Sequence, residues 1–419
     1  MSLKNKNPLT LLNVSAFLQT QFFLLPVLFL FYRYCGLSLG DFFLFQGCFS
    51  LAVFIFEIPM GYLGDVISKK NVLILSYSFF IARLVLWLFF SRYGYWIILV
   101  GELLFAAQKA SFSGAADSYI YEYLKQHNKP QKMLEKYGKM NFFLAAGTAF
   151  SSWPATVLYH KVSEWTEFKY GYNYGFVFLM LLELVMNIIA LYLLTFLPKI
   201  REGCFSQKTV SELYKNFFSV LKNTVRNKKL IYHSLYSGLL ISMTSVFVWS
   251  FQPMMKRFLF PVSMYGLVYF INHVFRAFSS LFLSKTREII SFSKMYLLTF
   301  FLFFCSFVLT FVLFNIQNDS IFLCLFYFTF VSFAIAMQLT YHLSTTSRLH
   351  VFSSPNIRAT VSSVNMAVGR LFSVFFLVLI KLLLNVYSFQ KVFAICFALF
   401  VVMSICLRKV YFISREEEK

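Results

Sequence analysis

Ionisable side chains inside long apolar stretches are the residues of this chain with the clearest chemical potential. The stretch 95–123 carries Glu102, Lys109 and Asp117 among apolar and small residues. Glu102 and Lys109 are seven residues apart, which places them on one face of a helix, about 10 Å apart along its axis. A carboxyl group in low-dielectric surroundings can hold and release a proton near neutral pH. We therefore predict that Glu102 and Asp117 are proton-coupling residues; the alternative is a structural ion pair, of Glu102 with Lys109 or of Asp117 with an arginine of another helix.

Other apolar stretches carry polar residues that suit contact with a solute. Gln338 and His342 stack one turn apart on a helix, and a histidine can change its charge near neutral pH. The alternative for His342 is a packed, hydrogen-bonding role. Glu57 is a third proton-coupling candidate, or it hydrogen-bonds to the loop that follows it. The residues that we expect to contact a solute are Gln19, Lys109, Gln252, Gln338, Tyr341, His342 and Arg370.

Four more ionisable residues lie within apolar stretches, where an unpaired charge is costly. Arg276 and His273, like Arg370, are predicted to pair with carboxylates or with an anionic solute. Arg83 and Glu183 are predicted to be peripheral.

The elements that position these residues must lie in an apolar medium. Of the 419 residues, 59% are hydrophobic and 13% are charged, with 57 phenylalanines. One soluble core cannot bury this much apolar surface, so the chain is predicted to be an integral membrane protein. Uninterrupted runs long enough to cross the bilayer exclude the alternating pattern of barrel strands and predict an all-α fold. Twelve transmembrane helices are expected, at 9–32, 42–64, 71–90, 95–123, 137–160, 175–197, 230–256, 262–284, 290–313, 318–347, 357–383 and 387–410.

The basic residues predict how the helices are oriented. Most of the 38 Lys and Arg residues lie at the two termini and in alternate loops, on one side of the membrane. By the positive-inside rule, both termini are cytoplasmic. Anionic membrane lipid explains most of the net charge of +21 without a nucleic-acid partner. The many Phe and Lys with little Arg suggest an AT-rich bacterial genome, and hence a bacterial inner (plasma) membrane.

A long polar stretch at 198–229 divides the chain. It separates an N-terminal six-helix bundle, 1–197, from a C-terminal bundle with a short cytoplasmic tail, 230–419. The stretch itself is predicted to be a basic cytoplasmic linker on the membrane surface; partner binding is the alternative. Apolar residues at helical spacing make 210–225 amphipathic.

Small residues and a charge cluster follow the second apolar stretch. The run is Gly61-Tyr62-Leu63-Gly64-Asp65-Val66-Ile67-Ser68-Lys69-Lys70. Its two glycines allow a close helix approach in lipid, and the lysines suit a cytoplasmic surface. An ordinary Gly-Asp turn with positive-inside lysines is the alternative to a specific role.

This run resembles the loop signature of the major facilitator superfamily, although Val66 replaces a basic residue and Ser68 a glycine. The segments Phe56-Glu57-Ile58-Pro59, Trp249-Ser250-Phe251-Gln252-Pro253 and 358–370 resemble a bacterial branch of drug-efflux-type carriers. The equivalent loop of the second half, 284–288, has lost the Gly-x-x-Gly-Asp frame. The resemblance implies two pseudo-symmetric six-helix bundles that rock about a midplane site.

The resemblance also implies roles for single residues. Gly61, Gly64, Asp65, Lys69 and Lys70 form a gate, in which Asp65 faces the N-terminal end of the eleventh helix. The first, fourth, seventh and tenth helices line a central cavity. Efflux carriers of the family often have a glycine-rich motif on the fifth helix, and 147–154 retains only a proline from it.

Several kinds of chemistry have no motif in the sequence. A phosphate-binding Gly-rich loop is absent, which argues against direct ATP drive, and there is no hydrolase nucleophile motif. The seven cysteines lack metal-ligand spacing. We expect no enzyme activity, no cofactor and no metal site.

The sequence thus predicts a secondary active transporter that works by alternating access, with proton-coupled efflux of an amphipathic or drug-like compound as the first expectation. The alternatives are proton-coupled uptake of a nutrient or metal-chelate, with Arg370 and Lys109 as anion-binding groups, and a non-transporting membrane receptor or scaffold. The expected partners are a small-molecule substrate, protons and membrane lipid. A monomer suffices for this mechanism.

Overall fold

The computed structural model describes residues 7–91, 94–129, 132–200, 228–281, 292–315, 320–351 and 358–416, with isolated positions between 211 and 219. Within these ranges, side chains at several helix ends are outside the description, among them those of 61–62, 64–66, 343–344, 346–351, 358–365 and 408–416. The amphipathic segment expected at 210–225 lies almost entirely outside the described residues.

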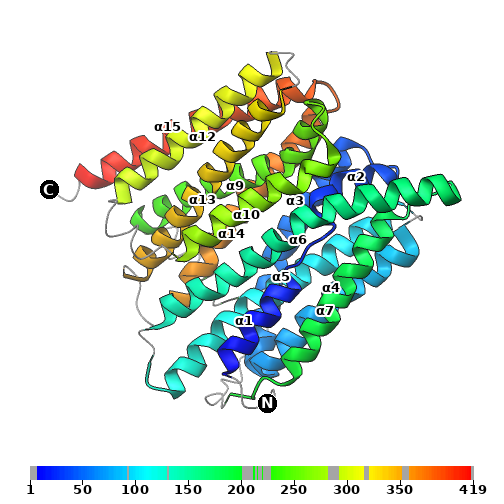
Figure 1. Ribbon diagram of the computed structural model, residues 1–419. Helices are drawn as coiled ribbons and strands as arrows, with labels where there is room; N and C mark the ends of the chain where they lie inside the picture. The colour runs from blue at the N-terminus through cyan, green and yellow to red at the C-terminus, as the bar shows by residue number, and fades with distance from the viewer. Residues whose placement is uncertain are drawn as a thin grey trace.

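The described chain consists of helices and their connections (Figure 1). Both chain ends lie toward the same end of the bundle, which we call the terminal end; the opposite end is the far end. The elements are α1 (Pro8–Gln19), η2 (Leu25–Val27), α2 (Leu28–Tyr34), α3 (Leu39–Val66), α4 (Lys69–Phe90), α5 (Tyr95–Gln126), α6 (Met133–Tyr170), α7 (Gly175–Thr195), α9 (Lys228–Arg257), η5 (Val262–Met264), α10 (Tyr265–Leu281), α12 (Phe292–Asn315), α13 (Ile321–Val351), α14 (Arg358–Leu383) and α15 (Phe389–Glu416).

Nine helices of the described chain are long and apolar enough to cross a membrane. The three other expected spans correspond to the broken segment α1–η2–α2, to the less apolar α6 and to the short α10. The all-α integral membrane fold expected from the sequence is therefore confirmed, and the helix count agrees with twelve crossings. α6 continues ten residues beyond the expected end at 160, and Gly171, at φ 70°, follows its last turn.

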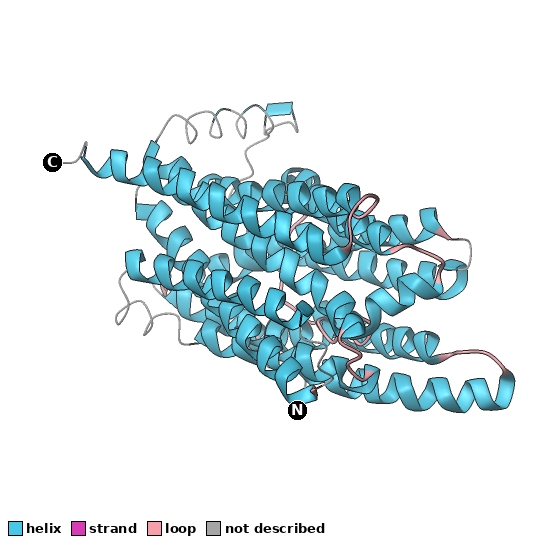
Figure 2. Cartoon of the chain, turned by 90° about the horizontal axis from the view of Figure 1, so that it is seen from above, coloured by secondary structure: helices cyan, strands magenta, loops and turns pink. Residues whose placement is uncertain are grey.

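The helices form two groups that pack against each other (Figure 2). The N-terminal group comprises α1 to α7, and the C-terminal group comprises α9 to α15. α6 packs along α10, and α3 packs along α14. The first contact requires glycine at 266, because an added Cβ there would lie 2.0 Å from the backbone oxygen of Ser152. Small residues thus let the two groups approach closely.

The first helix is broken, where the sequence predicted a continuous span over 9–32. Residues 20–24 are not helical, and η2 connects them to α2. Pro26 explains the break, because proline has no N–H and its ring clashes with the carbonyl four residues earlier. Side chains from both groups satisfy the freed backbone: Thr148 donates to the Thr20 carbonyl at 2.9 Å, and Gln252 donates to the Leu25 carbonyl at 2.8 Å. The Phe29 N–H in turn donates to Oε1 of Gln252 at 2.7 Å.

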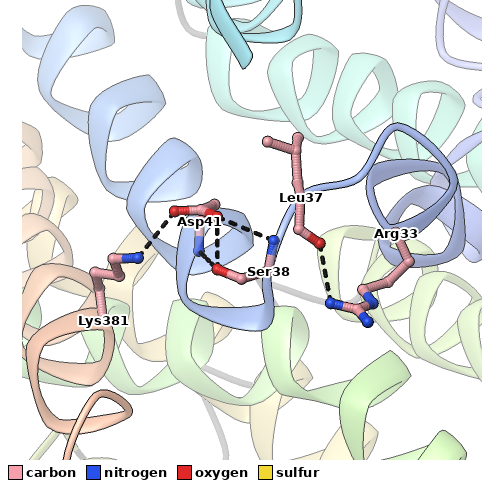
Figure 3. A network of polar contacts seen from close by, with 5 residues as sticks. All are labelled: Arg33, Leu37, Ser38, Asp41 and Lys381. Carbon is pink, nitrogen blue, oxygen red and sulfur yellow. Dashed lines mark hydrogen bonds and ion pairs between the residues drawn. The ribbon is translucent and has the colours of Figure 1, made fainter. Parts of the chain in front are cut away.

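An ion pair joins the two groups at the far end (Figure 3). Lys381 of α14 lies 2.9 Å from Asp41 of α3. Asp41 also completes a capping box with Ser38 at the start of α3, so its carboxylate is held in place by its own helix. Thr156 of α6 adds a second contact, donating to the Ser263 carbonyl at 2.9 Å. These two polar contacts therefore join the groups toward the far end.

Candidate functional site

Three basic side chains from both groups interact near the middle of the bundle. Lys109 of α5 is within electrostatic range of Arg276 of α10 and of Arg370 of α14. None of the three forms a salt bridge within the described residues. Like charges repel strongly in low-dielectric surroundings. We call Lys109, Arg276 and Arg370 the basic site.

One carboxylate and two histidines interact with the basic site. Glu57 of α3 acts electrostatically on Arg370, and its role in proton coupling stays a prediction. His273 interacts with Arg276 and Lys109, and its Nδ1 has no hydrogen-bond partner among the described residues. His342 interacts with Arg370, and its Nδ1 lies 2.9 Å from the Ser237 hydroxyl. The positive charge of the site exceeds the negative charge that Glu57 supplies.

Aromatic rings surround the ammonium group of Lys109. It lies 5.2 Å from the centroid of Phe22 and 5.4 Å from that of Phe105. Phe22 belongs to the break in the first helix, and the two rings are packed edge to face, 5.7 Å apart. Rings at these distances attract a cation through their quadrupole, and they also provide an apolar surface.

Glu102 is not paired with Lys109, the pairing considered from their spacing. Its carboxylate lies 3.4 Å from Nη2 of Arg83 and accepts a hydrogen bond of 2.6 Å from the Tyr32 hydroxyl. The prediction failed because seven residues define a helix face but not which neighbouring helix that face meets. α5 packs against α4, which carries Arg83.

Arg83 and Glu183 are buried, so the prediction that they are peripheral is wrong. Arg83 is 4% exposed and Glu183 is 1% exposed. The Arg83 guanidinium lies 4.0 Å from the Trp87 ring and 4.5 Å from the Phe105 ring. The signal was present in the sequence, because a charge in the middle of an apolar span is a functional candidate by default.

Asp117 lies two turns below Lys109 on α5. Its carboxylate acts on Tyr137 of α6, and it has no salt bridge within the part of the chain that the structure describes. The alternative of a structural ion pair with an arginine thus has no support there. Its role in proton coupling stays a prediction.

The gate motif is only partly described. The surroundings of Gly61 and Gly64 and the side chain of Asp65 lie outside the description. So do the side chains at the N-terminal end of α14, which Asp65 is expected to face. Lys70 donates a hydrogen bond of 2.6 Å to the Thr195 carbonyl at the end of α7, which anchors the start of α4. Ser68 caps α4 by accepting from the Asn71 N–H.

The remaining solute candidates are Gln19, Gln252, Gln338 and Tyr341. Gln252 is occupied by the broken first helix and by the Tyr269 hydroxyl, at 2.9 Å, which gives it a structural role. Gln338 accepts from the Thr244 hydroxyl at 3.2 Å, and the Tyr341 ring packs near that of Tyr296. Gln19 is fully buried with neither side-chain polar atom hydrogen-bonded in the described structure.

The described helices, nine of them long and apolar enough to cross a membrane, define a multi-pass membrane protein. In the described ranges, no cluster of three His, Cys, Asp or Glu side chains is placed to bind a metal ion. The family model of the Major Facilitator Superfamily matches residues 9–371. The chain belongs to this superfamily and is a secondary transporter.

Solved structures of transporters have the same fold. A mutant of the nucleoside transporter NupG superposes with a TM-score of 0.73 at 13% identity, covering 97% of this chain and 100% of that one. A bacterial homolog of the human lysosomal transporter Spinster, inward-facing and occupied, gives 0.66 at 14% identity, covering 98% and 96%. The human organic anion transporter MFSD10 gives 0.64 at 14% identity, covering 95% and 98%. No curated protein sequence matches this chain. At these identities, the likeness shows the fold alone.

Proposed function

We propose that this transporter moves a small organic anion that binds between the two helix groups at the basic site. The observation that carries the proposal is that Lys109 of α5 is within electrostatic range of Arg276 of α10 and of Arg370 of α14, and that Glu57 acts on Arg370 alone. Cations within a membrane span are stable only when an anion or a cavity compensates them. A bound anion supplies the missing charge.

The origin of the three cations also suits alternating access. Lys109 belongs to the N-terminal group, whereas Arg276 and Arg370 belong to the C-terminal group. An anion between them offsets their repulsion and lets the groups approach, and its release favours their separation. We keep the division into 1–197, the linker 198–229 and 230–419 as the proposed boundaries of the moving parts.

The charge of the solute bears on the driving force. With both termini cytoplasmic in a bacterial plasma membrane, an inside-negative potential opposes anion entry by about 2.3 kcal/mol per charge at 100 mV. Accumulation of an anion therefore needs coupling to a second solute, and a co-transported proton offsets the charge of the anion. We propose proton-coupled uptake, in which a buried carboxyl group carries the proton.

Proton-coupled efflux of an amphipathic or drug-like compound is the second candidate. The rings of Phe22 and Phe105 beside Lys109 favour it, since they provide apolar contact for the body of such a solute. The two candidates differ in direction, and both differ from a receptor or scaffold, which moves nothing.

Metabolite profiling of cells and medium distinguishes these functions. A deletion strain is compared with strains restored by the wild type or by Arg370→Gln. We expect an anionic metabolite to be depleted in deletion cells and restored by the wild type alone. A neutral or cationic compound that accumulates in the deletion strain would replace the proposal with efflux, and identical profiles would contradict transport.

A further inference from the structure

A second group of charges lies toward the far end, next to the basic site: Arg83 and Lys109 both lie over the Phe105 ring. Arg83 of α4, Glu102 of α5 and Glu183 of α7 are buried together, with Tyr32 of α2 beside them. Arg83 contacts Glu102 directly and interacts electrostatically with Glu183. Neither Arg83 nor Glu183 has a place in the anion site. We call Arg83, Glu102 and Glu183 the acidic cluster.

The charges of the acidic cluster do not balance. Two carboxylates share one guanidinium, and the residues are 4%, 1% and 1% exposed. An uncompensated charge buried in low-dielectric surroundings is avoided by gaining or losing a proton. One proton on either carboxyl group makes the cluster neutral.

The hydrogen bonds indicate which carboxyl group holds this proton. Glu102 has the close arginine and the 2.6 Å bond that the Tyr32 hydroxyl donates, and both stabilise a carboxylate. Glu183 has neither, and its Oε2 lacks a hydrogen-bond partner within the described structure. The buried proton therefore belongs on Glu183.

The surroundings of Glu183 supply few other charges. α7 packs against α1, α4 and α6. Arg83 of α4 acts electrostatically on Glu183. The backbone N–H of Leu24, in the non-helical segment after α1, also acts on the Glu183 carboxyl group. No ionisable side chain of α6 acts on Glu183 among the described residues. Lys109 is the next cation, within electrostatic range of Arg83.

We propose that Glu183 is the site that binds and releases the coupled proton, and that the break in the first helix transmits its charge to the anion site. This inference rests on the proposed function, because a coupled proton has a purpose only in a proton-driven carrier. In the step, a water-borne proton forms an O–H bond with the Glu183 carboxylate and is later returned to water on the other side of the membrane.

The route between the two sites is short and follows one segment. Loss of the proton places a second negative charge beside Arg83 and strengthens the attraction of Glu183 for the Leu24 N–H. Phe22, two residues away in the same non-helical segment, has its ring 5.2 Å from the Lys109 ammonium. A shift of residues 20–24 therefore changes the surroundings of a cation of the basic site. A break of this kind in a transmembrane helix is a suitable hinge, because its backbone is not fixed by helical hydrogen bonds.

Infrared spectroscopy of the full-length protein in lipid nanodiscs tests the proton site without any solute. We expect the C=O band of a protonated carboxylic acid at neutral pH that is absent from Glu183→Gln, present in the control Asp41→Asn and shifted in frequency in Glu183→Asp. Glu183→Asp keeps the test valid should the glutamine variant fail to fold. If neither Glu183→Gln nor Glu183→Asp removes or shifts a carboxylic acid band of the wild-type spectrum, the assignment is overturned.

Transport by reconstituted protein tests the coupling, with radiolabelled benzenesulfonate as the probe. Glu183→Gln is expected to lose accumulation driven by a pH gradient while it retains exchange of labelled for unlabelled probe at equal pH. Accumulation at the wild-type level in this variant would overturn the inference. Absence of any wild-type flux of anions would contradict the proposed function instead, and the infrared result would still decide the proton site.

Discussion

Ser68 has a backbone conformation that residues other than glycine rarely adopt, with φ 58° and ψ 139°. Such a conformation costs on the order of 1–3 kcal/mol in a residue other than glycine. The family pattern has glycine at this position, and the structure gives the physical reason. The seryl hydroxyl offsets part of the cost by capping α4 at Asn71.

We predict that Ser68→Gly stabilises the protein by about 1 kcal/mol, since removing the strain outweighs the few tenths lost with the cap. Thermal unfolding in detergent measures the change as a rise in Tm. Asn128→Gly is the matched control: Asn128 also has a positive φ, 55°, but asparagine tolerates it. A fall in Tm for Ser68→Gly, or an equal rise for both variants, would contradict the strain argument.

For single residues, the sequence indicated which ionisable side chains lie within apolar spans, but not which partners they meet. The sequence identified Lys109 and Arg370 as candidates, and the structure brings them within range of each other. It assigned the wrong neighbour to Glu102, because pairing depends on how α4 and α5 rotate against each other. That rotation is set by packing of many apolar side chains, and no short motif encodes it.

At the scale of elements, the broken first helix depends on one glutamine from the other group. Gln252 accepts from the Phe29 N–H at the start of α2 and donates to the Leu25 carbonyl, which also accepts from the Leu28 N–H. A buried backbone group without a partner costs about 1–3 kcal/mol.

Gln252→Leu is therefore predicted to lower the free energy of unfolding by about 2 kcal/mol, chiefly because the Phe29 N–H loses its partner. Gln338→Leu is a suitable comparison, because Gln338 has one hydrogen bond to the Thr244 hydroxyl, and its loss costs about 1 kcal/mol. Chemical denaturation in detergent gives both values. Equal losses in the two variants would show that Gln252 does not support the break.

The bounds of most helices follow from the lengths of apolar runs, whereas the break does not. Residues 9–32 are as apolar as a continuous span, and Pro26 alone indicates a kink and not five non-helical residues. The non-helical state persists because Thr148 and Gln252, distant in sequence, satisfy its carbonyls. Such long-range compensation is visible only in the folded molecule.

At the scale of the whole molecule, composition and the spacing of apolar runs were enough to predict an all-helical membrane protein with twelve crossings, and the resemblance of the run 61–70 to a family signature predicted a transporter. The contacts between groups were not predictable in detail, since the Asp41–Lys381 pair joins residues 340 positions apart. The excess of basic side chains at the basic site and of carboxyl groups in the acidic cluster emerged only when the helices were assembled.

Binding selectivity for charge tests the central claim most directly. Purified full-length protein is titrated with benzenesulfonate and with its neutral analogue benzenesulfonamide, using wild type, Arg276→Gln, Arg370→Gln and the control Arg33→Gln. Arg33 lies at the far end and donates to the Leu37 carbonyl, outside the basic site (Figure 3).

The account predicts that the wild type binds the sulfonate more tightly than the sulfonamide. Loss of either arginine of the basic site weakens sulfonate binding by about tenfold or more, as expected for removal of one partner of a buried charge pair, while Arg33→Gln leaves it unchanged. Equal affinity for the charged and neutral probes, or affinities that do not respond to Arg276 and Arg370, would contradict an anion site between the two helix groups.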